Sequence, residues 1–423
     1  MILRFAGWFA VFSTLRYRDF RLFWIGLVSQ VTGQQMMMVT MGWLAFDLTG
    51  SPLALGFINL LTALPRLTIS VLGGVLADKW DQRKLITGAQ LLSAITLVSI
   101  ASLTVTENIE VWHLAVAALF IGLVQAFDEP SRAALFPRLL PDRSMIPAAV
   151  PLVSIAWSST RIVAPSIAGF VIAASGAGTS FFISAVGSTV MVTTLAMLRT
   201  GTVPSARSGT MWTNLQDGAY FAWGNLVFRS VIGLAFLYSF FGLGFMMVLP
   251  VFAKEVMDVG PKGLGLLYSA HGIGAIAATI TFGKLSRKIP HGRLATLGLA
   301  AFAALLIVFA LNPYYLLSLP LLTLMGFAGV TFQTGGQVIL QTMVPDRLRG
   351  RVMGVHGMHW SFLPLGGAVV NTIANFTGAP YALAGSASVL LLAALAIGLR
   401  NEQLRDLRLE QMEEATSATS ARH

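Results

Sequence analysis

The chain has 423 residues, of which 55% are hydrophobic and only 11% charged, and its mean hydropathy is +0.74. A soluble chain of this length carries about a quarter charged residues, so the composition indicates a membrane protein and excludes an ordinary soluble enzyme. The net charge of +10 does not indicate a nucleic-acid partner, because the basic residues are scattered over short loops rather than gathered on one face.

The first segment, Met1–Phe20, has basic residues on both sides of a short apolar run and no small-residue cleavage site. We interpret it as a cytoplasmic amphipathic lead-in rather than a removed signal peptide. The whole chain lacks cysteine, which excludes disulfides and cysteine metal sites.

Twelve apolar segments follow, each about 18 to 27 residues long, which is enough to cross roughly 30 Å of hydrocarbon with some tilt. The first six are Leu22–Phe46, Ala54–Ala77, Leu85–Val105, His113–Phe136, Ala149–Ala174 and Thr179–Leu198. The second six are Ser230–Ala253, Gly263–Gly283, Leu294–Leu311, Tyr315–Gln341, Val352–Asn375 and Ala379–Leu399. We therefore expect an all-α membrane protein with twelve transmembrane helices.

The spans fall into two sets of six, separated by a polar stretch. We divide the chain into an N-terminal six-helix bundle over 1–200, a cytoplasmic linker over 201–229, a C-terminal six-helix bundle over 230–400 and a cytoplasmic tail over 401–423. Within the linker, Trp212–Trp223 carries apolar and aromatic residues on one face and is predicted to be an interfacial helix. The tail is charged and then Ser/Thr-rich, and we expect a short helix that frays.

The distribution of basic residues predicts the orientation. With both termini inside, 24 of the 28 Lys and Arg residues fall in cytoplasmic segments. The exceptions are Lys254 and Lys262 in outer loops, and Arg66 and Arg161 within spans. Under the positive-inside rule this one-sided distribution favours cytoplasmic termini and an even number of spans.

An internal repeat relates the two halves. Pro141-Asp142-Arg143 after the fourth span matches Pro345-Asp346-Arg347 after the tenth, at an offset of 204. Gly283–Lys288 after the eighth span echoes Gly74–Lys79 at an offset of 209. Halves repeated in parallel order are typical of transporters that bind their substrate at the interface of the repeats, near the bilayer midplane.

The loop after the second span has an unusual charge density. Gly73–Leu85 places five charged residues within seven positions, between two nearly uncharged spans. This pattern resembles the loop between the second and third helices of major facilitator superfamily transporters. The resemblance implies a conformational gate made by Gly74, Asp78 and Arg83 together with Arg132 at the end of the fourth span.

Three further stretches carry the resemblance: Leu48–Gly56, Phe127–Pro137 and Arg161–Gly169. Together they resemble the major facilitator branch that contains enterobactin exporters and macrolide efflux proteins. The likeness implies a secondary transporter, in a branch of mostly exporters, and does not specify a substrate. Ala164 stands where a glycine commonly precedes the fifth-span proline, so the antiporter-like motif is incomplete and supports proton antiport less than transport.

Charged residues inside spans are functional candidates because burying a charge in a bilayer is costly. Arg161 and Arg66 each have two interpretations, a cavity base for an anionic group or a structural anchor near a proline. Asp128 and Glu129 are candidates for proton coupling, since a partly desolvated carboxyl can take up a proton. The alternative is a charge clamp between Asp128 and Arg132, one turn away.

Polar stripes on two spans predict a substrate pathway. Gln333 and Gln337 follow one face of the tenth span, and Gln30 and Gln34 follow one face of the first. Such amides face either a wet cavity or a neighbouring helix, and we favour the cavity. Arg161 joins this pathway, and two seventh-span aromatic residues, Tyr238 and Phe241, could add a wall, although aromatic stripes are more often ordinary packing.

Enzyme chemistry is not indicated. His356 and His359 share a helix face, but two imidazoles without an acid do not predict a metal site, and a neutral hydrogen-bonding role is the better interpretation. The sequence has neither a phosphate-binding loop ending in Gly-Lys-Ser/Thr nor a Gly-x-Ser-x-Gly elbow. We expect no cofactor and no metal.

The sequence thus predicts a monomeric secondary transporter in the bacterial inner membrane, both termini cytoplasmic. It would export an amphipathic organic compound (drug, macrolide or siderophore-like) by alternating access, with protons as the coupling ion and the lipid bilayer as its surroundings. One alternative is an importer of an organic anion, suggested by Arg66 and Arg161. A membrane-embedded enzyme or receptor is the other, although the outer loops are too short for a receptor domain.

Overall fold

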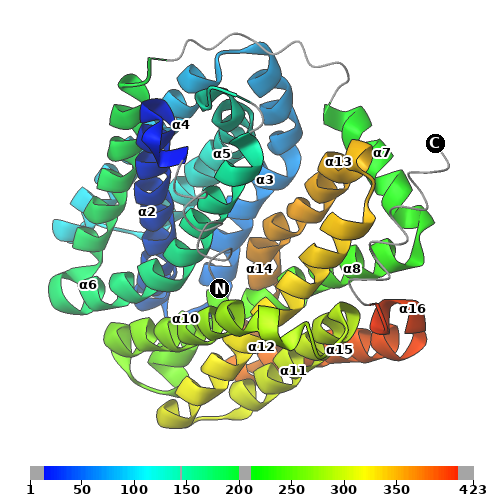
Figure 1. Ribbon diagram of the computed structural model, residues 1–423. Coiled ribbons are helices and arrows are strands. Elements are labelled where there is room, and N and C mark those ends of the chain that lie inside the picture. Colours follow the sequence, from blue (N-terminus) through cyan, green and yellow to red (C-terminus); the bar gives the residue numbers. More distant parts are fainter. Residues whose placement is uncertain (1–13, 143–144, 200–210, 408–423) are drawn as a thin grey trace. The chain divides into compact units, whose positions relative to one another are not determined.

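A computed structural model describes residues 14–142, 145–199 and 211–407 of the chain, and the regular elements in these ranges are helices (Figure 1). Within them the side chains at 70–72, 74–75, 77–79, 147, 211–215 and 346–347 are not described. The first elements are η1 (Thr14–Arg16), α2 (Arg18–Thr49), α3 (Pro52–Lys79), α4 (Gln82–Val105), α5 (Val111–Leu135), η2 (Phe136–Leu139) and α6 (Ile146–Ala196).

The remaining elements begin within the predicted linker. They are α7 (Met211–Gly224), α8 (Leu226–Leu237), η4 (Tyr238–Gly242), η5 (Leu243–Met247), α9 (Leu249–Val251), η6 (Phe252–Val256), α10 (Gly260–Leu285), α11 (His291–Leu311), α12 (Tyr315–Met343), α13 (Asp346–Gly357), η7 (Met358–Ser361), α14 (Phe362–Thr377), α15 (Ala379–Arg400) and α16 (Glu402–Arg405). The chain forms two compact units, the first made of Met1–Thr49 and Leu61–Ser208, the second of Gly50–Leu60 and Gly209–His423.

The predicted all-α membrane fold is confirmed. In the described part of the chain, nine helical stretches are long and apolar enough to cross a membrane. One of them, within α6, supplies two spans, because Gly176 takes φ 80° and breaks the helix between the predicted fifth and sixth segments. Only glycine adopts this backbone conformation without strain.

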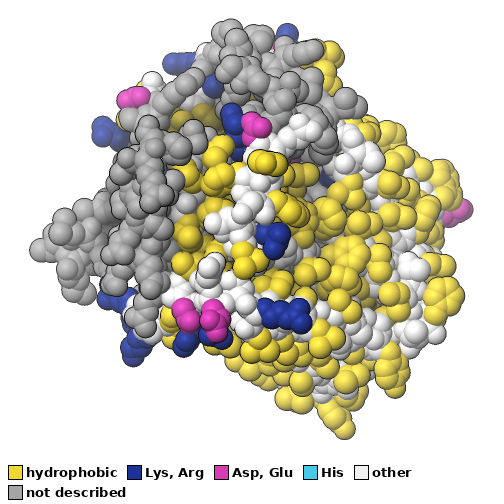
Figure 2. All heavy atoms as spheres, turned by 90° about the vertical axis from the view of Figure 1, so that its right-hand side faces the viewer, with side chains coloured by type: hydrophobic (Ala, Val, Ile, Leu, Met, Phe, Trp, Pro, Cys, Tyr) yellow, Lys and Arg dark blue, Asp and Glu magenta, His cyan; other side chains and the backbone are white. Residues whose placement is uncertain are grey.

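The surface of the described residues also fits a bilayer. Figure 2 shows hydrophobic side chains over a wide area with few charged ones among them. Exposed examples include Ile280, Leu316 and Leu392, each more than two-thirds accessible. Apolar surface of this extent is unusual on a soluble monomer and is expected where lipid tails are the solvent.

Glycines allow close helix contacts within the first unit. On α2, Gly33 lies against the backbone of Ser184, and on α6, Gly187 lies against the backbone of Ser29. Thr40 and Ser180 share a buried hydrogen bond of 2.6 Å at the same crossing. Small residues let membrane helices approach until backbones touch, which favours dispersion contacts that lipid cannot supply.

The internal repeat is visible in the packing of the two units. Gly122 of α5 lies against the Thr62 carbonyl of α3, and Gly326 of α12 lies against the His271 carbonyl of α10. The two glycines are 204 positions apart and the two carbonyls 209 positions apart, the same offsets as the repeated loops. The second and fourth spans of each half therefore cross in the same way.

The seventh and eleventh spans are broken helices, whereas the sequence predicts two continuous ones. In the seventh, α8 passes into a π-helical turn at Tyr238–Gly242 and a 3₁₀ stretch at Leu243–Met247. In the eleventh, the 3₁₀ turn η7 separates α13 from α14. The two spans touch where Gly366 of α14 meets the Phe240 carbonyl. Such irregular turns often mark functional hinges.

The linker helix α7 corresponds to the segment predicted over Trp212–Trp223. One face packs on α13, where Gly218 lies against Arg351 and Asp217 pairs with the Arg351 guanidinium at 2.6 Å. On the other face, Tyr220 is 86% exposed and Trp223 is 55% exposed. An exposed aromatic pair of this kind suits a membrane interface.

The tail docks under the second unit as far as it is described. Leu404 of α16 is fully buried in a cluster with Val227 and Phe228 of α8. Arg293 at the start of α11 donates two hydrogen bonds to Asp406, at 3.0 and 2.7 Å, and these hold the pKa of Asp406 below its usual value. The short helix expected in the tail is therefore tied to the body of this unit.

Candidate functional site

A buried ion pair lies on α5 of the first unit. Asp128 of α5 is 2% exposed, and its Oδ2 atom lies 2.8 Å from Nε of Arg132, one turn along the same helix. A charge in such surroundings is stable only when it is paired and hydrogen-bonded. The structure therefore contains the Asp128–Arg132 charge clamp, one of the two interpretations that the sequence left open.

Amides from two other helices complete the network. Gln30 of α2 donates to Asp128 Oδ2 at 3.1 Å, and Gln90 of α4 donates to Asp128 Oδ1 at 3.0 Å. Arg132 Nη1 donates to Gln30 Oε1 at 3.0 Å, and its guanidinium lies 5.2 Å from the centre of the Trp157 ring on α6. One buried carboxylate thus ties together α2, α4 and α5.

Gln30 has two roles in this network, because its amide bonds both members of the ion pair. Gln90 differs, since its Oε1 atom is buried and has no hydrogen-bond partner among the described residues. A primary amide can turn to present either its donor or its acceptor. Gln90 therefore has the capacity to hydrogen-bond Asp128 in either of that residue's protonation states.

Glu129 is in a different environment. It pairs with Arg66 of α3 at 3.1 Å, but its side chain is 55% exposed, whereas that of Arg66 is 15% exposed. The adjacent carboxyls of α5 therefore separate into one buried in a network and one at the surface of the unit. The pairing also neutralises Arg66, which the sequence left open as an anion-binding base.

The other predicted pathway residues of the first unit are less buried. Gln34 on α2 and Arg161 on α6 are both half-buried. Of the predicted pathway residues, Gln30 is the one that the described hydrogen bonds place on Asp128 and Arg132.

The charged loop supports the end of α6. Arg83 donates to the carbonyls of Leu198 and Ala196 at 3.1 and 2.7 Å, which satisfies carbonyls that a helix C-terminus leaves open. The Asp81 side chain caps α4 by accepting from the Arg83 and Lys84 amides. For Gly74 and Asp78 only the helical backbone is described, so the predicted gate contact of Asp78 lies outside the described side chains.

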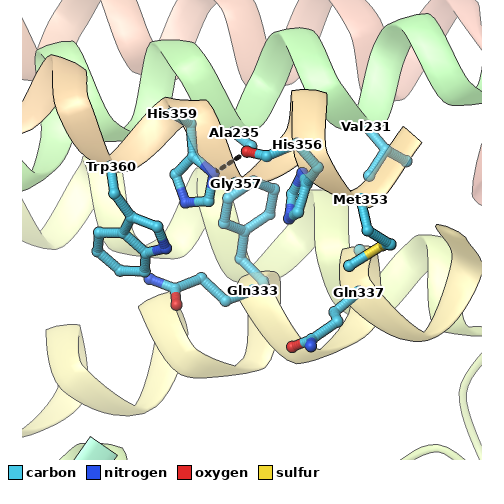
Figure 3. A pocket seen from close by; sticks show the side chains of 11 residues that line it. Val231, Ala235, Gln333, Gln337, Met353, His356, Gly357, His359 and Trp360 are labelled. Carbon is cyan, nitrogen blue, oxygen red and sulfur yellow. Dashed lines mark hydrogen bonds between the residues drawn. The ribbon is translucent and has the colours of Figure 1, made fainter. Parts of the chain in front are cut away.

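The second unit contains a cavity of about 200 Å³ between its seventh, tenth and eleventh spans (Figure 3). Its polar lining consists of Gln333 and Gln337 of α12, two of the predicted pathway residues, and His356 and His359 of the eleventh span. Trp360, Phe332 and Met353 supply most of the apolar lining. In Figure 3 the Gln333 amide lies beside the Trp360 ring.

Tyr238 and Phe241, the two aromatic residues predicted for the pathway, contact other aromatic rings of the second unit. Tyr238 is 1% exposed, and its ring packs edge-on against Phe302 and Phe332 at 4.9 and 5.1 Å. Phe241 is half-buried and contacts the ring of Phe240. Neither residue lines the cavity of this unit.

The sequence did not identify Gln90 or Trp360 as site residues. It predicted only a neutral hydrogen-bonding role for His356 and His359. Gln90 is a single amide on the third span, with no polar stripe to mark it. The positions of these residues depend on how the helices pack against one another. The periodicity of a single sequence does not predict that packing.

Comparison with known families supplies the identity. A family model described as "Transmembrane secretion effector" matches residues 9–422. The chain belongs to this family. Its members are major facilitator transporters, so the resemblance inferred from the loop and span motifs is confirmed.

Curated relatives of this transporter are efflux or siderophore proteins. It is 25% identical to the multidrug efflux pump Tap of Mycolicibacterium fortuitum, over 89% of this chain and 94% of that protein. It is 24% identical to the staphyloferrin A transporter of Staphylococcus aureus (80% and 85% covered). It is also 24% identical to the enterobactin exporter EntS of Escherichia coli (78% and 77% covered).

Solved structures agree on the fold. A bacterial homologue of the lysosomal transporter Spinster, crystallised facing inward, matches with a TM-score of 0.72 at 13% identity, covering 92% of this chain and 98% of that one. The nucleoside transporter NupG matches with a TM-score of 0.66 at 17% identity, covering 91% and 99%. At these identities the likeness shows the fold alone.

The chain is therefore a multi-pass membrane transporter and not an enzyme. Within the described residues no group of three or more His, Cys, Asp or Glu side chains could hold a metal ion.

Proposed function

We propose that this transporter exports an amphipathic organic compound, of the drug, macrolide or siderophore type, by alternating access driven by protons. The observation that carries the proposal is the buried Asp128–Arg132 pair, an ionisable acid inside a membrane-spanning helix. Intramembrane acids are costly and belong to ion and substrate pathways more often than to packing. The relatives named as efflux pump and exporter support the outward direction.

Asp128 is the proposed proton acceptor because its charge holds three helices together. When it is ionised, it accepts from Gln30 and Gln90 and pairs with Arg132. Protonation removes the charge, so Arg132 loses its counter-ion and keeps the Gln30 amide and the Trp157 ring. The Gln90 amide, turned over, accepts from the new O–H group. Proton uptake thereby removes the ion pair and weakens the tie between α5 and α2, which biases the unit toward another conformation.

Glu129 is a weaker candidate for this role. Its side chain is more than half exposed and pairs with Arg66 at the surface of the unit, where solvent screens the interaction. The same pair weakens the alternative of anion import, since Arg66 already has a carboxylate partner. We retain Gln34, Gln333, Gln337 and Arg161 as pathway residues, and Gly74, Asp78 and Arg83 as the gate.

We also propose a monomer in the bacterial inner membrane with both termini cytoplasmic. The bacterial relatives and the concentration of basic residues in the predicted cytoplasmic segments support this location and orientation.

Everted membrane vesicles with an acidic lumen test the proposal directly. We expect gradient-driven accumulation of at least one compound from a panel of ethidium, erythromycin and dihydroxybenzoate, abolished when an ionophore collapses the gradient. Asp128→Asn should abolish accumulation while equilibrium binding to the purified protein persists. Glu129→Gln, on the neighbouring position, serves as the matched control and should retain transport.

Three results would contradict the proposal. They are absence of accumulation for the whole panel, movement of dihydroxybenzoate in the opposite direction, or an Asp128→Asn variant as active as the parent. The second result would establish the import alternative.

A further inference from the structure

The cavity of the second unit has a lining without fixed charge. Its polar side chains are the amides Gln333 and Gln337 and the imidazoles His356 and His359. No carboxylate, Lys or Arg belongs to the lining, whose remaining members are apolar or glycine. An ionic ligand would enter this space without a counter-ion, at a large desolvation cost. The lining therefore favours an uncharged ligand.

The two histidines of the cavity reinforce this preference. Their ring centres are 4.8 Å apart, so a positive charge on one would oppose a positive charge on the other. His359 interacts through Nδ1 with the His356 carbonyl, and its ring also lies 4.7 Å from that of Trp360. No carboxylate of the lining could balance an imidazolium, so we treat both rings as neutral hydrogen-bonding groups.

The size of the cavity limits what it can hold. About 200 Å³ is below the range of roughly 300 to 1,000 Å³ typical of drug-sized ligands. It exceeds the engineered apolar cavity of about 150 Å³ that binds benzene. One six-membered ring fits, and Trp360 and Phe332 supply aromatic surfaces against it.

His356 supplies a polar group that lacks a partner. Its ring lines the cavity, and its buried Nδ1 atom has no hydrogen-bond partner among the described residues. A neutral imidazole has one donor and one acceptor, and each amide offers both. A hydroxyl, which donates and accepts at once, can satisfy this set whichever imidazole tautomer is present.

We propose that the cavity lined by Gln333, Gln337, His356 and Trp360 binds an uncharged aromatic ring bearing a hydroxyl group, a phenol. The inference rests on the proposed export of an amphipathic compound, of which this ring is one part. It also assigns a different function to each unit: proton coupling to the charge pair of the first, and binding of a neutral ring to the cavity of the second.

The test is equilibrium binding of phenol, toluene and benzoate to the purified full-length protein in nanodiscs. Phenol remains neutral, and benzoate charged, across pH 5.5 to 8, judged from the ordinary pKa values near 10 for Tyr and near 4 for carboxyls. We expect phenol to bind about tenfold tighter than toluene, which leaves the polar lining unsatisfied. Phenol affinity should not change between pH 5.5 and 8, and benzoate should not bind. Gly336→Leu, which fills the cavity, measures the background from lipid.

Two substitutions at one position separate hydrogen bonding from shape. His356→Gln keeps a neutral donor and acceptor and should retain the preference for phenol. His356→Leu should reduce the preference for phenol over toluene from about tenfold to none. His113→Gln, on α5 of the other unit, should behave like the parent.

Equal affinity for phenol and toluene in the parent would overturn the inference. So would a preference in His356→Leu as large as in the parent, or benzoate binding that strengthens at pH 5.5, which would indicate a cationic anion site instead. These measurements need no transport, so they can fail while pH-driven accumulation in vesicles persists, and the reverse also holds.

Discussion

At the scale of single residues, two ion pairs of the first unit differ in how far water is excluded from them. Asp128 and Arg132 are 2% and 8% exposed, whereas Glu129 is 55% exposed beside Arg66. Removing one partner of a buried pair leaves an uncompensated charge and costs about 3–5 kcal/mol. An exposed pair contributes at most about 1 kcal/mol. We therefore expect a large loss of stability when the Asp128 pair is broken and a small one when the pair of its neighbour Glu129 is broken.

A double-mutant cycle measures this difference. Arg132→Gln should lower the free energy of unfolding by about 3–5 kcal/mol, and adding Asp128→Asn should recover most of that loss, because the stranded charge is removed. Arg66→Gln, the matched control, should cost about 1 kcal/mol or less. Thermal unfolding in detergent compares the parent, the Arg132→Gln and Asp128→Asn single variants, the double variant and the Arg66→Gln control. Additive losses in the double variant would show that the two residues do not interact.

The sequence indicated these residues but not their partners. Asp128 and Arg132 are one turn apart on a single helix, so helical spacing alone suggested their clamp. Gln30 and Gln90 come from other helices, and their contacts with Asp128 depend on how α2 and α4 rotate against α5. The resemblance implies a gate role for Arg83, and its guanidinium bonds the carbonyls of Ala196 and Leu198, at the end of α6 and just beyond it. Such contacts depend on how the helices pack, which local sequence patterns do not predict.

At the scale of elements, hydrophobic length predicted the spans well because the bilayer demands about 20 apolar residues per crossing. It did not predict the breaks in the seventh and eleventh spans. The π-helical turn at Tyr238–Gly242 contains no proline, and Pro65, Pro130 and Pro320 lie inside helices that continue through them. In a membrane, neighbouring helices can satisfy the backbone groups that a proline leaves unpaired. Proline therefore does not predict where a membrane helix breaks.

The repeated crossings of the second and fourth spans depend on two glycines. A Cβ at Gly122 or Gly326 would collide with the Thr62 or His271 carbonyl, and backbone atoms cannot move aside cheaply. Gly122→Val and Gly326→Val should each destabilise the protein by about 1–3 kcal/mol, typical of overpacking. Gly88→Val and Gly283→Val, where no atom lies within 4 Å of the added Cβ, are the controls and should be nearly neutral.

Thermal melting of the detergent-solubilised variants tests this expectation. If Gly122→Val and Gly326→Val melt with the controls, the crossings do not depend on close backbone contact. If only one of them is destabilised, the crossing of the second and fourth spans does not depend on close backbone contact in both halves.

At the scale of the whole molecule, the duplicated halves have acquired different chemistry. The first unit holds a buried acid tied to three helices, and the second holds an uncharged cavity bordered by two broken helices. In the proposed mechanism, protonation of the first unit and occupation of the second bias the same conformational equilibrium. Coupling of this kind requires only that each ligand prefers one of the two conformations.

The absence of cysteine from the sequence makes alternating access measurable without a background. Single cysteines at Gln34 and Gln337 can be challenged with a membrane-impermeant maleimide from either side of oriented vesicles, under opposite pH gradients. The account predicts that each position reacts from the cytoplasmic side under one gradient and from the outer side under the reverse. Reaction from the same side under both gradients would contradict alternating access and with it the proposed transport cycle.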